Sequence, residues 1–493
     1  MEMLYNALLG ELVGRSISFL VSKYGSQPAT AAAAVREEHL QRLRLLLLRS
    51  GTILEEADGR HVANRGALRR QLEALRDEMF RGHYVLDTFR YQAGRRPAGR
   101  HDAKEATSRR RVFGSSVSNP AKRVRRLRLS PDDDDPELQR VVLNLETIVG
   151  DTKELVMFLM RCPPLHRQPY SAHLSLDKCM FGRHAERDRV IEFLLQPDPP
   201  DAANPGVLPI IGPALIGKST LVEHVCNDER VRNCFSLILF YTRNELEYET
   251  ITSFMDNCVI KHRRNNASND ERWLIVIEVS GDVDDRTWKR LHSAGRWHMA
   301  KGSKLIVTSR SEKIARFGTT TQPLRLKCLT TEAFWYFFKL LVFGSTDPEE
   351  HPKLASMAME MAVEMRGSFM GAGICATILR TNFSAQFWYM NLTRLRWYMQ
   401  KNLALFGEYP DDLKATDQPR RTWSIIRPVP DECFLFYEMY QRGTVREDAL
   451  PEVTMVDLMT GRAEQRGKFE ILYWKSTVPP YFSYICPCEI SNM

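Results

Sequence analysis

Nine residues from Gly212 to Thr220 have the types and the spacing needed to hold a phosphate group. They read Gly-Pro-Ala-Leu-Ile-Gly-Lys-Ser-Thr and fit the pattern G-x-x-x-x-G-K-[ST]. In such a loop, backbone N–H groups and the N-terminus of the next helix attract anions. We expect Lys218 to reach the outer phosphates of a nucleotide and Ser219 to offer its hydroxyl to Mg²⁺. The apolar run 207–211 precedes the loop and a helical pattern follows it, which is the setting that the motif requires.

The loop departs from the usual glycine-rich form at three positions. Pro213 supplies no N–H group, and Leu215 and Ile216 stand where small residues normally let the backbone curl around phosphate. The minimum chemistry is still present in Gly212, Gly217, Lys218, Ser219 and Thr220. We therefore expect nucleotide binding without efficient hydrolysis, and at most a slow ATPase.

A second largely apolar run, 273–279, carries one acidic residue next to its end. Glu278 is the candidate to approach Mg²⁺ and to orient water for catalysis, and the alternative is an ordinary strand-end residue. Val279 follows, so no second carboxylate stands beside it as a general base. The later Asp282, Asp284 and Asp285 fit the turn that opens the next helix, where aspartate is a common cap.

A basic residue ends a third apolar run. Arg310 follows the run 305–308, and at that edge of a sheet it could sense a terminal phosphate through charge-assisted hydrogen bonds. The alternative is an exposed arginine that starts the next helix.

These residues need a sheet to bring them together. Continuous apolar runs alternate with helical patterns over 175–345, which predicts a parallel sheet covered on both faces. The expected strands are 207–211, 237–241, 274–279, 305–308 and 324–328, and the expected helices between them include 221–226 and 288–294. Ligands of such sheets bind beyond the carboxyl ends of the strands, where the phosphate loop falls.

The rest of the 493-residue chain divides by composition. Helically spaced leucines predict a helical, coiled-coil-type bundle over 1–92, and blocks of like charge predict a disordered linker over 93–136. A connecting helix is expected at 137–165, and helical periodicity returns at 346–410. The tail 411–493 shows one strand pattern, at 469–474, and is expected to be an irregular α+β region. The fold class is therefore multidomain: a helical bundle, a phosphate-loop α/β sheet, a helical region and the tail.

Charge and cysteine usage narrow the class of protein. A net charge of +8 is mild and comes largely from the linker, which argues against a dedicated nucleic-acid binder. Its basic cluster 122–128 fits a solvated linker, with a nuclear-import signal or a membrane-surface patch as alternatives. The ten cysteines lack the spacing of a zinc site. No apolar run reaches the length of a membrane span. We therefore expect a cytoplasmic protein with reduced thiols, and a nuclear location is the alternative.

In order, these segments resemble the NB-ARC domain of plant disease-resistance proteins. The similarity is most specific over 212–240, and it includes Phe181-Gly182-Arg183 before the loop and the strand 302–310. Residues 80–91 resemble the last helix of the Rx-type coiled-coil domain found in many of these receptors. Neither a Gly-Leu-Pro-Leu motif near 367–378 nor a Met-His-Asp triplet is present, and no leucine-rich repeat array is seen.

The resemblance implies an ADP/ATP-controlled switch in the defence response, with Mg²⁺ as a further cofactor. It places Gly182 and Arg183 near the base, Lys218 and Ser219 at the phosphates and the metal, Glu278 in place of paired aspartates, and Arg310 as phosphate sensor. The implied partners are other immune receptors or signalling proteins, reached through the N-terminal helices, together with self-association. The second hypothesis is a degenerate, non-hydrolysing scaffold that pairs with other immune receptors through those helices.

Overall fold

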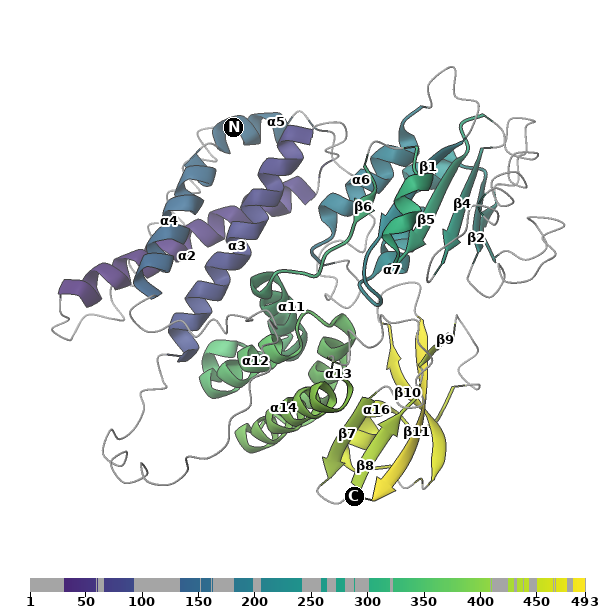
Figure 1. Cartoon of the computed structure of the whole chain (residues 1–493). Helices are drawn as coiled ribbons and strands as arrows, with labels where there is room; N and C mark the ends of the chain where they lie inside the picture. Colours follow the sequence, from purple (N-terminus) through teal and green to yellow (C-terminus); the bar gives the residue numbers. More distant parts are fainter. Residues whose placement is uncertain are drawn as a thin grey trace, which may run out of the picture.

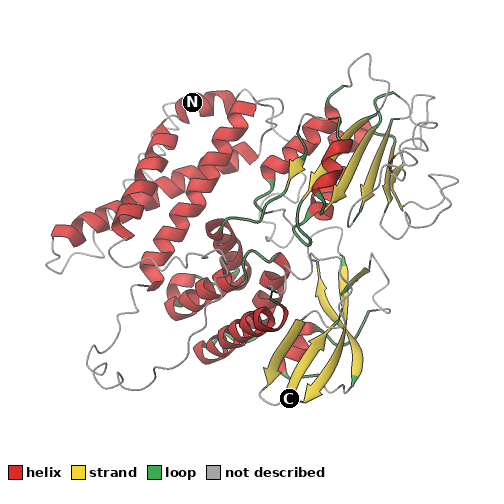
Figure 2. Ribbon diagram, in the orientation of Figure 1, coloured by secondary structure: helices red, strands yellow, loops and turns green. Residues whose placement is uncertain are grey.

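The computed structural model shows four regions that follow one another along the chain (Figure 1). A helical bundle is followed by an α/β domain, a second group of helices and an antiparallel sheet (Figure 2). This confirms the predicted fold class. The structure describes residues 31–58, 66–92, 134–150, 152–160, 181–197, 205–241, 259–263, 272–279, 301–319, 322–407, 424–429, 432–437, 439–442, 450–463, 467–476 and 482–492, and the single residues 60, 162, 288, 409 and 465.

The N-terminal bundle consists of α2 (Ala31–Asp58), α3 (Gly66–Gln92), α4 (Asp134–Gly150) and the short α5 (Thr152–Met160). Its core is built from the leucine stripes of the sequence, including Leu43, Leu75, Leu138 and Leu145, which are fully buried. α4 begins at Asp134, inside the stretch expected to be linker, and the expected connecting helix is divided between α4 and α5. The helical pattern at 1–20 and most of the expected linker lie outside the described residues.

The α/β domain contains a six-stranded sheet with the order β3-β2-β4-β5-β1-β6. Its strands are β1 (Gly206–Ile211), β2 (Leu237–Tyr241), β3 (Val259–Arg263), β4 (Trp273–Glu278), β5 (Lys304–Ser309) and β6 (Leu324–Arg325). All neighbours are parallel except β3, which runs antiparallel to β2 at the edge. The sequence did not predict β3, because Val-Ile-Lys-His-Arg is too polar to read as an apolar run.

Both faces of this sheet are buried, which explains the continuous apolar strands. Leu208 and Ile210 pack against α6 (His184–Leu195), α7 (Lys218–Cys226) and α8 (Glu229–Cys234). The alternate residues Val207 and Ile211 belong to a cluster on the other face, which includes the 3₁₀ helix η2 (Glu312–Phe317). β6 is shorter than expected, and the helix expected at 288–294 lies outside the described residues except for Trp288.

The second helical group consists of α11 (Thr331–Phe343), η3 (Pro348–Glu350), α12 (Pro352–Glu364), α13 (Phe369–Arg380) and α14 (Ala385–Phe406). The side chains of Thr330, Ser368 and Ser384 cap α11, α13 and α14 by accepting from backbone N–H groups. α3 of the bundle packs against α11 and α12, and Tyr91 at its end lies in their core. The bundle and this group therefore share one apolar interface.

The described residues of the tail form an antiparallel sheet and the helix α16 (Met455–Thr460). Its strands are β7 (Ser424–Val429), β8 (Glu432–Phe436), β9 (Tyr440–Arg442), β10 (Lys468–Lys475) and β11 (Ser483–Asn492), in the order β10-β11-β8-β7 with β9 also pairing with β11. β10 is the strand that the sequence predicted at 469–474. Cys486 and Cys488 are buried in the core of this sheet.

Candidate nucleotide-binding site

The phosphate loop lies at the carboxyl edge of the parallel sheet, between the end of β1 and the start of α7. Gly212 is fixed there because its N–H donates to the carbonyl oxygen of Ser309 at 3.2 Å, and a Cβ at Gly212 would lie 2.9 Å from the carbonyl oxygen of Leu326. Leu215 and Gly217 both have positive φ, 57° and 93°. Backbone that alternates between left-handed and right-handed residues turns successive N–H groups to one side and makes a concave anion site.

Lys218 folds back over this loop. Its ammonium group donates to the carbonyl oxygens of Gly212 at 2.8 Å and Pro213 at 2.7 Å. A lysine ammonium has three N–H donors, so one is left for a phosphate oxygen. Burial lowers the pKa of Lys218 to about 8, with a further lowering from Arg310 and an opposing effect from Glu278. An anion bound at the loop would favour the charged form and raise that pKa.

Glu278 and Arg310 meet Lys218 at the same edge. Glu278 ends β4 opposite Thr308 of the neighbouring β5, and the N–H of Val279 donates to the carbonyl oxygen of Thr308 at 2.9 Å. Arg310 directly follows β5, and both groups act on the charge of Lys218. The tertiary structure therefore gathers the three charged candidates around the loop, while Ser219 and Thr220 lie half-buried in the first turn of α7.

Gly182 and Arg183 lie at the start of α6. Gly182 has φ of 68°, and a Cβ there would lie 2.8 Å from Cδ2 of Leu329. The guanidinium of Arg183 is buried: it donates to Oε1 of Glu186 at 2.8 Å and to the carbonyl oxygen of Lys327 at 2.6 Å. Arg183 thus ties α6 to the segment that links β6 to α11. The guanidinium of Arg183 is thus bonded to other residues of the protein. Its contact with the base of a nucleotide stays a prediction.

Two features near the loop could not be read from the sequence. Leu215 packs against the apolar cluster of the C-terminal sheet, and Tyr484 of that sheet lies near Glu278, whose negative charge helps burial to raise the tyrosine's pKa to about 12. The only sequence signal was a large apolar residue at a loop position that favours glycine. Nothing in that signal points to a segment more than 200 residues away.

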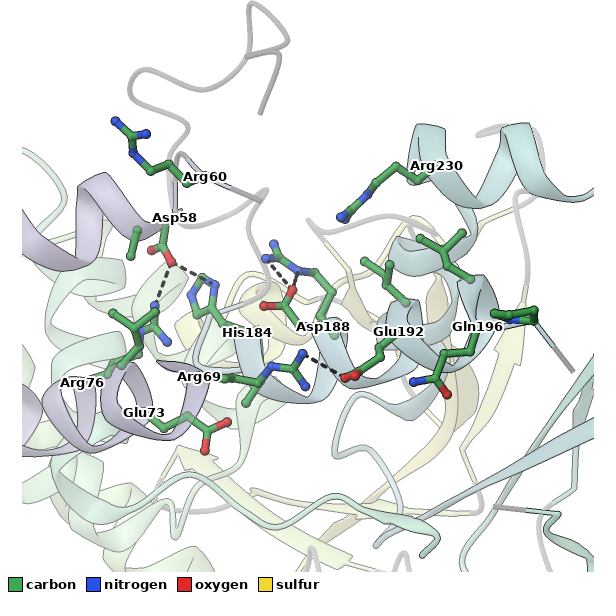
Figure 3. A pocket seen from close by; sticks show the side chains of 17 residues that line it. Asp58, Arg60, Arg69, Glu73, Arg76, His184, Asp188, Glu192, Gln196 and Arg230 are labelled. Carbon is green, nitrogen blue, oxygen red and sulfur yellow. Dashed lines mark hydrogen bonds and ion pairs between the residues drawn. The ribbon is translucent and has the colours of Figure 1, made fainter. Parts of the chain in front are cut away.

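A cavity of about 230 Å³ lies elsewhere, between α2 and α3 of the bundle and α6 and α8 of the α/β domain (Figure 3). Its charged residues are largely paired: Arg76 with Asp58 at 2.8 Å, and Arg69 with Glu192 at 3.0 Å. Burial, with Arg76 and Arg187 nearby, lowers the pKa of His184 to about 3, so this histidine is neutral. None of the phosphate-loop residues lines this cavity, which we interpret as a polar seam between two domains.

The sheet is parallel except for β3, and a phosphate loop follows its first strand. A lysine, a glutamate and an arginine lie at its carboxyl edge. These features define a phosphate-loop α/β nucleotide-binding domain. Residues 183–348 match the family model of the NB-ARC domain, a family of ATP- and ADP-binding domains. This segment is therefore an NB-ARC domain, and the resemblance to that domain seen in the sequence is confirmed.

The chain is also similar to plant disease-resistance proteins. It is 22% identical to "Disease resistance protein RGA2" of Solanum bulbocastanum over 70% of this chain and 34% of that protein. It is 24% identical to "Putative disease resistance RPP13-like protein 1" of Arabidopsis thaliana over 70% of this chain and 33% of that protein. The chain thus spans about a third of the length of these relatives. Among the described helices, none is long and apolar enough to cross a membrane.

Proposed function

We propose that this chain is a nucleotide-binding signalling protein of plant defence, controlled by whether its phosphate loop holds ADP or ATP. The observation that carries the proposal is the shape of the loop: Leu215 and Gly217 have the left-handed backbone of an anion site, and Lys218 lies over it with one donor to spare. The relatives named as disease-resistance proteins supply the biological setting. The proposed location is the cytoplasm, with the nucleus as an alternative.

Each residue of the loop region has a proposed task. Lys218 and the loop backbone bind the outer phosphates, and the hydroxyl of Ser219 holds Mg²⁺, which would neutralise phosphate charge when bound. Glu278 lies on the metal side, and Arg310 contacts the terminal phosphate. Such contacts can favour one of two domain packings, and one packing would expose the surface that meets other immune receptors, signalling proteins or a second copy.

A second candidate is a degenerate scaffold that does not hydrolyse ATP and pairs with other immune receptors through its helical N-terminus. The observation that favours it is the apolar Val279 directly after Glu278: the N–H of Val279 is bonded within the sheet, and no second carboxylate follows on β4 to act as a general base. In this case ATP turnover is at most slow, and the helical bundle provides the pairing surface.

The test is the nucleotide content of the purified protein, released by denaturation and identified. Lys218→Ala is compared with Lys353→Ala, an exposed lysine on α12, and far-ultraviolet circular dichroism checks that the helices remain. We expect ADP in near-stoichiometric amount in the wild type and in Lys353→Ala, and its loss in Lys218→Ala. Wild-type protein that is empty and takes up no added ADP or ATP would refute the proposal.

A further inference from the structure

Leu215 has a backbone conformation that leucine avoids. Its φ of 57° is in the left-handed region, where Cβ crowds the following carbonyl oxygen. Within the described ranges only Leu215 and Arg366 have positive φ without being glycine. A residue remains in such a conformation only when its surroundings fix it. The phosphate loop therefore needs a contact that holds Leu215.

An apolar cluster that the C-terminal sheet forms together with α13 and α16 provides that contact. The side chain of Leu215 packs against this cluster, whose buried members include Met370 and Ile374 of α13, Met455 of α16, and Phe436, Ile471 and Tyr473 of the sheet. The loop lies in the α/β domain, and the strands of this cluster come more than 200 residues later. The half-buried Leu215 side chain thus joins the phosphate loop to the cluster that the tail shares with α13.

The sheet is anchored by contacts that do not involve the loop. Asn402 of α14 is fully buried, donates to the carbonyl oxygen of Ile425 at 2.8 Å and accepts from its N–H at 2.8 Å. Arg394 donates to the carbonyl oxygen of Met459 at 3.1 Å. On α13, a Cβ at Gly373 would lie 2.7 Å from Nε1 of Trp474, so the absence of a side chain there permits close packing. The sheet is therefore held in place by α13 and α14, independently of its contact with the loop.

The end of the sheet that faces the nucleotide site carries two aromatic residues. Trp474 near the end of β10 and Tyr484 near the start of β11 have ring centroids 5.7 Å apart. This end lies toward the α/β domain and the C-terminus lies at the other end (Figure 1). The influence of Glu278 on the pKa of Tyr484 agrees with this placement. The tail therefore approaches the loop and the acidic strand end of the site together.

We propose that the C-terminal sheet is part of the phosphate site, and that Leu215 is a positioning residue through which the sheet holds the loop in its anion-binding shape. A loop held in shape before the ligand arrives loses less conformational freedom on binding, so affinity is higher. As far as affinity is concerned, the inference rests on the proposed nucleotide-binding function. The shape of the loop without ligand does not depend on it.

The first experiment changes Leu215 in the full-length chain. Affinity for fluorescently labelled ADP with Mg²⁺ is measured beside hydrogen exchange of the loop amides in nucleotide-free protein. Leu215→Ala keeps a Cβ in the left-handed region but loses the anchor, so we expect faster exchange and affinity weaker by about tenfold. Leu215→Met keeps an apolar anchor of similar volume and should stay near the wild type. Wild-type exchange and affinity in Leu215→Ala, or equal losses in Leu215→Met, would overturn the inference.

The second experiment approaches the contact from the tail. Tyr484 and Ile490 lie on the same strand and pack against the same cluster, about 20 Å apart along β11. Tyr484→Ala should speed exchange of the loop amides, while Ile490→Ala, the matched control, should leave them unchanged. Equal effects of the two variants would show that exchange of the loop amides depends only on the overall stability of the tail, and this would contradict the proposal. If the wild type binds no nucleotide, the proposed function fails, but the exchange results still decide whether the sheet holds the loop.

Discussion

Asp87 links the N-terminal bundle to the second helical group through a buried ion pair. Its carboxylate, 3% exposed, accepts from the ammonium of Lys339 at 2.6 Å and from the indole N–H of Trp335 at 2.9 Å. Asp87 lies on α3, and both donors lie on α11. Replacing Asp87 by alanine should therefore weaken the docking of α3 more than any exposed ion pair does.

The expected magnitude follows from burial. Removing one partner of a buried ion pair leaves the other charge uncompensated and costs about 3–5 kcal/mol. Lys339, only 13% exposed, would be that uncompensated charge, and Trp335 would lose its acceptor. In the double variant Asp87→Asn with Lys339→Met the amide oxygen still accepts from Trp335 and no charge is stranded. The free energy of local opening of α3 in this double variant should be within about 1–2 kcal/mol of the wild-type value.

The assay is hydrogen exchange of the α3 amides, which reports the free energy of local opening without assuming that a multidomain chain unfolds in one step. A loss of about 3–5 kcal/mol raises the opening constant by roughly two to nearly four orders of magnitude. Arg90→Ala is the matched control, because Arg90 also lies on α3 and pairs with Glu349 across the same interface, but with side chains 25% and 55% exposed. It should cost less than about 1 kcal/mol. Similar losses in Asp87→Ala and Arg90→Ala, or a double variant no better than Asp87→Ala, would refute the reasoning.

Two further predictions concern the site and the tail. Because the pKa of Lys218 is lowered to about 8, ADP affinity should fall as pH rises above about 8, where the free lysine is neutral and must take up a proton on binding. Glu278→Gln should move this fall in affinity to lower pH, because the Glu278 carboxylate raises the pKa of Lys218. Lys218→Arg should make ADP affinity nearly independent of pH, because arginine stays charged. A wild-type affinity that does not change from about pH 7 to 9.5 would contradict the argument. Asn402→Ala leaves the N–H and C=O of Ile425 without their side-chain partner. Hydrogen exchange of the β7 and β8 amides should therefore show a free energy of local opening lower by about 2–4 kcal/mol. A decrease below about 1 kcal/mol would show that water replaces the amide.

The sequence alone determined the elements that local pattern controls. Continuous apolar runs gave β1, β2, β4 and β5 to within about a residue, because strands buried on both faces exclude polar side chains. The phosphate loop could be recognised because its residues are contiguous and their spacing is set by the strand–loop–helix geometry. The meeting of Lys218, Glu278 and Arg310 also followed from the sequence, since parallel strands end at one edge.

Elements that depend on distant pairing were not visible in the same way. β3 is polar enough to read as a loop, and it becomes a strand because β2 offers it a free edge. The tail remained without a firm fold because β11 pairs with β8, a strand about 50 residues earlier in the chain. The resemblance placed Arg183 near the base of a nucleotide. Only the folded chain brings the carbonyl oxygen of Lys327 to the Arg183 guanidinium.

The tertiary structure alone decided what supports the loop and what holds the bundle. The sequence showed Leu215 only as a departure from the motif, but in the structure it packs against a cluster built from α13 and from a tail more than 200 residues away. Asp87 read as one residue of an amphipathic helix, and its partners Trp335 and Lys339 lie about 250 residues later. Such contacts carry no local signal, because a side chain's spacing shows which face of its own element it occupies but not which other element will cover that face.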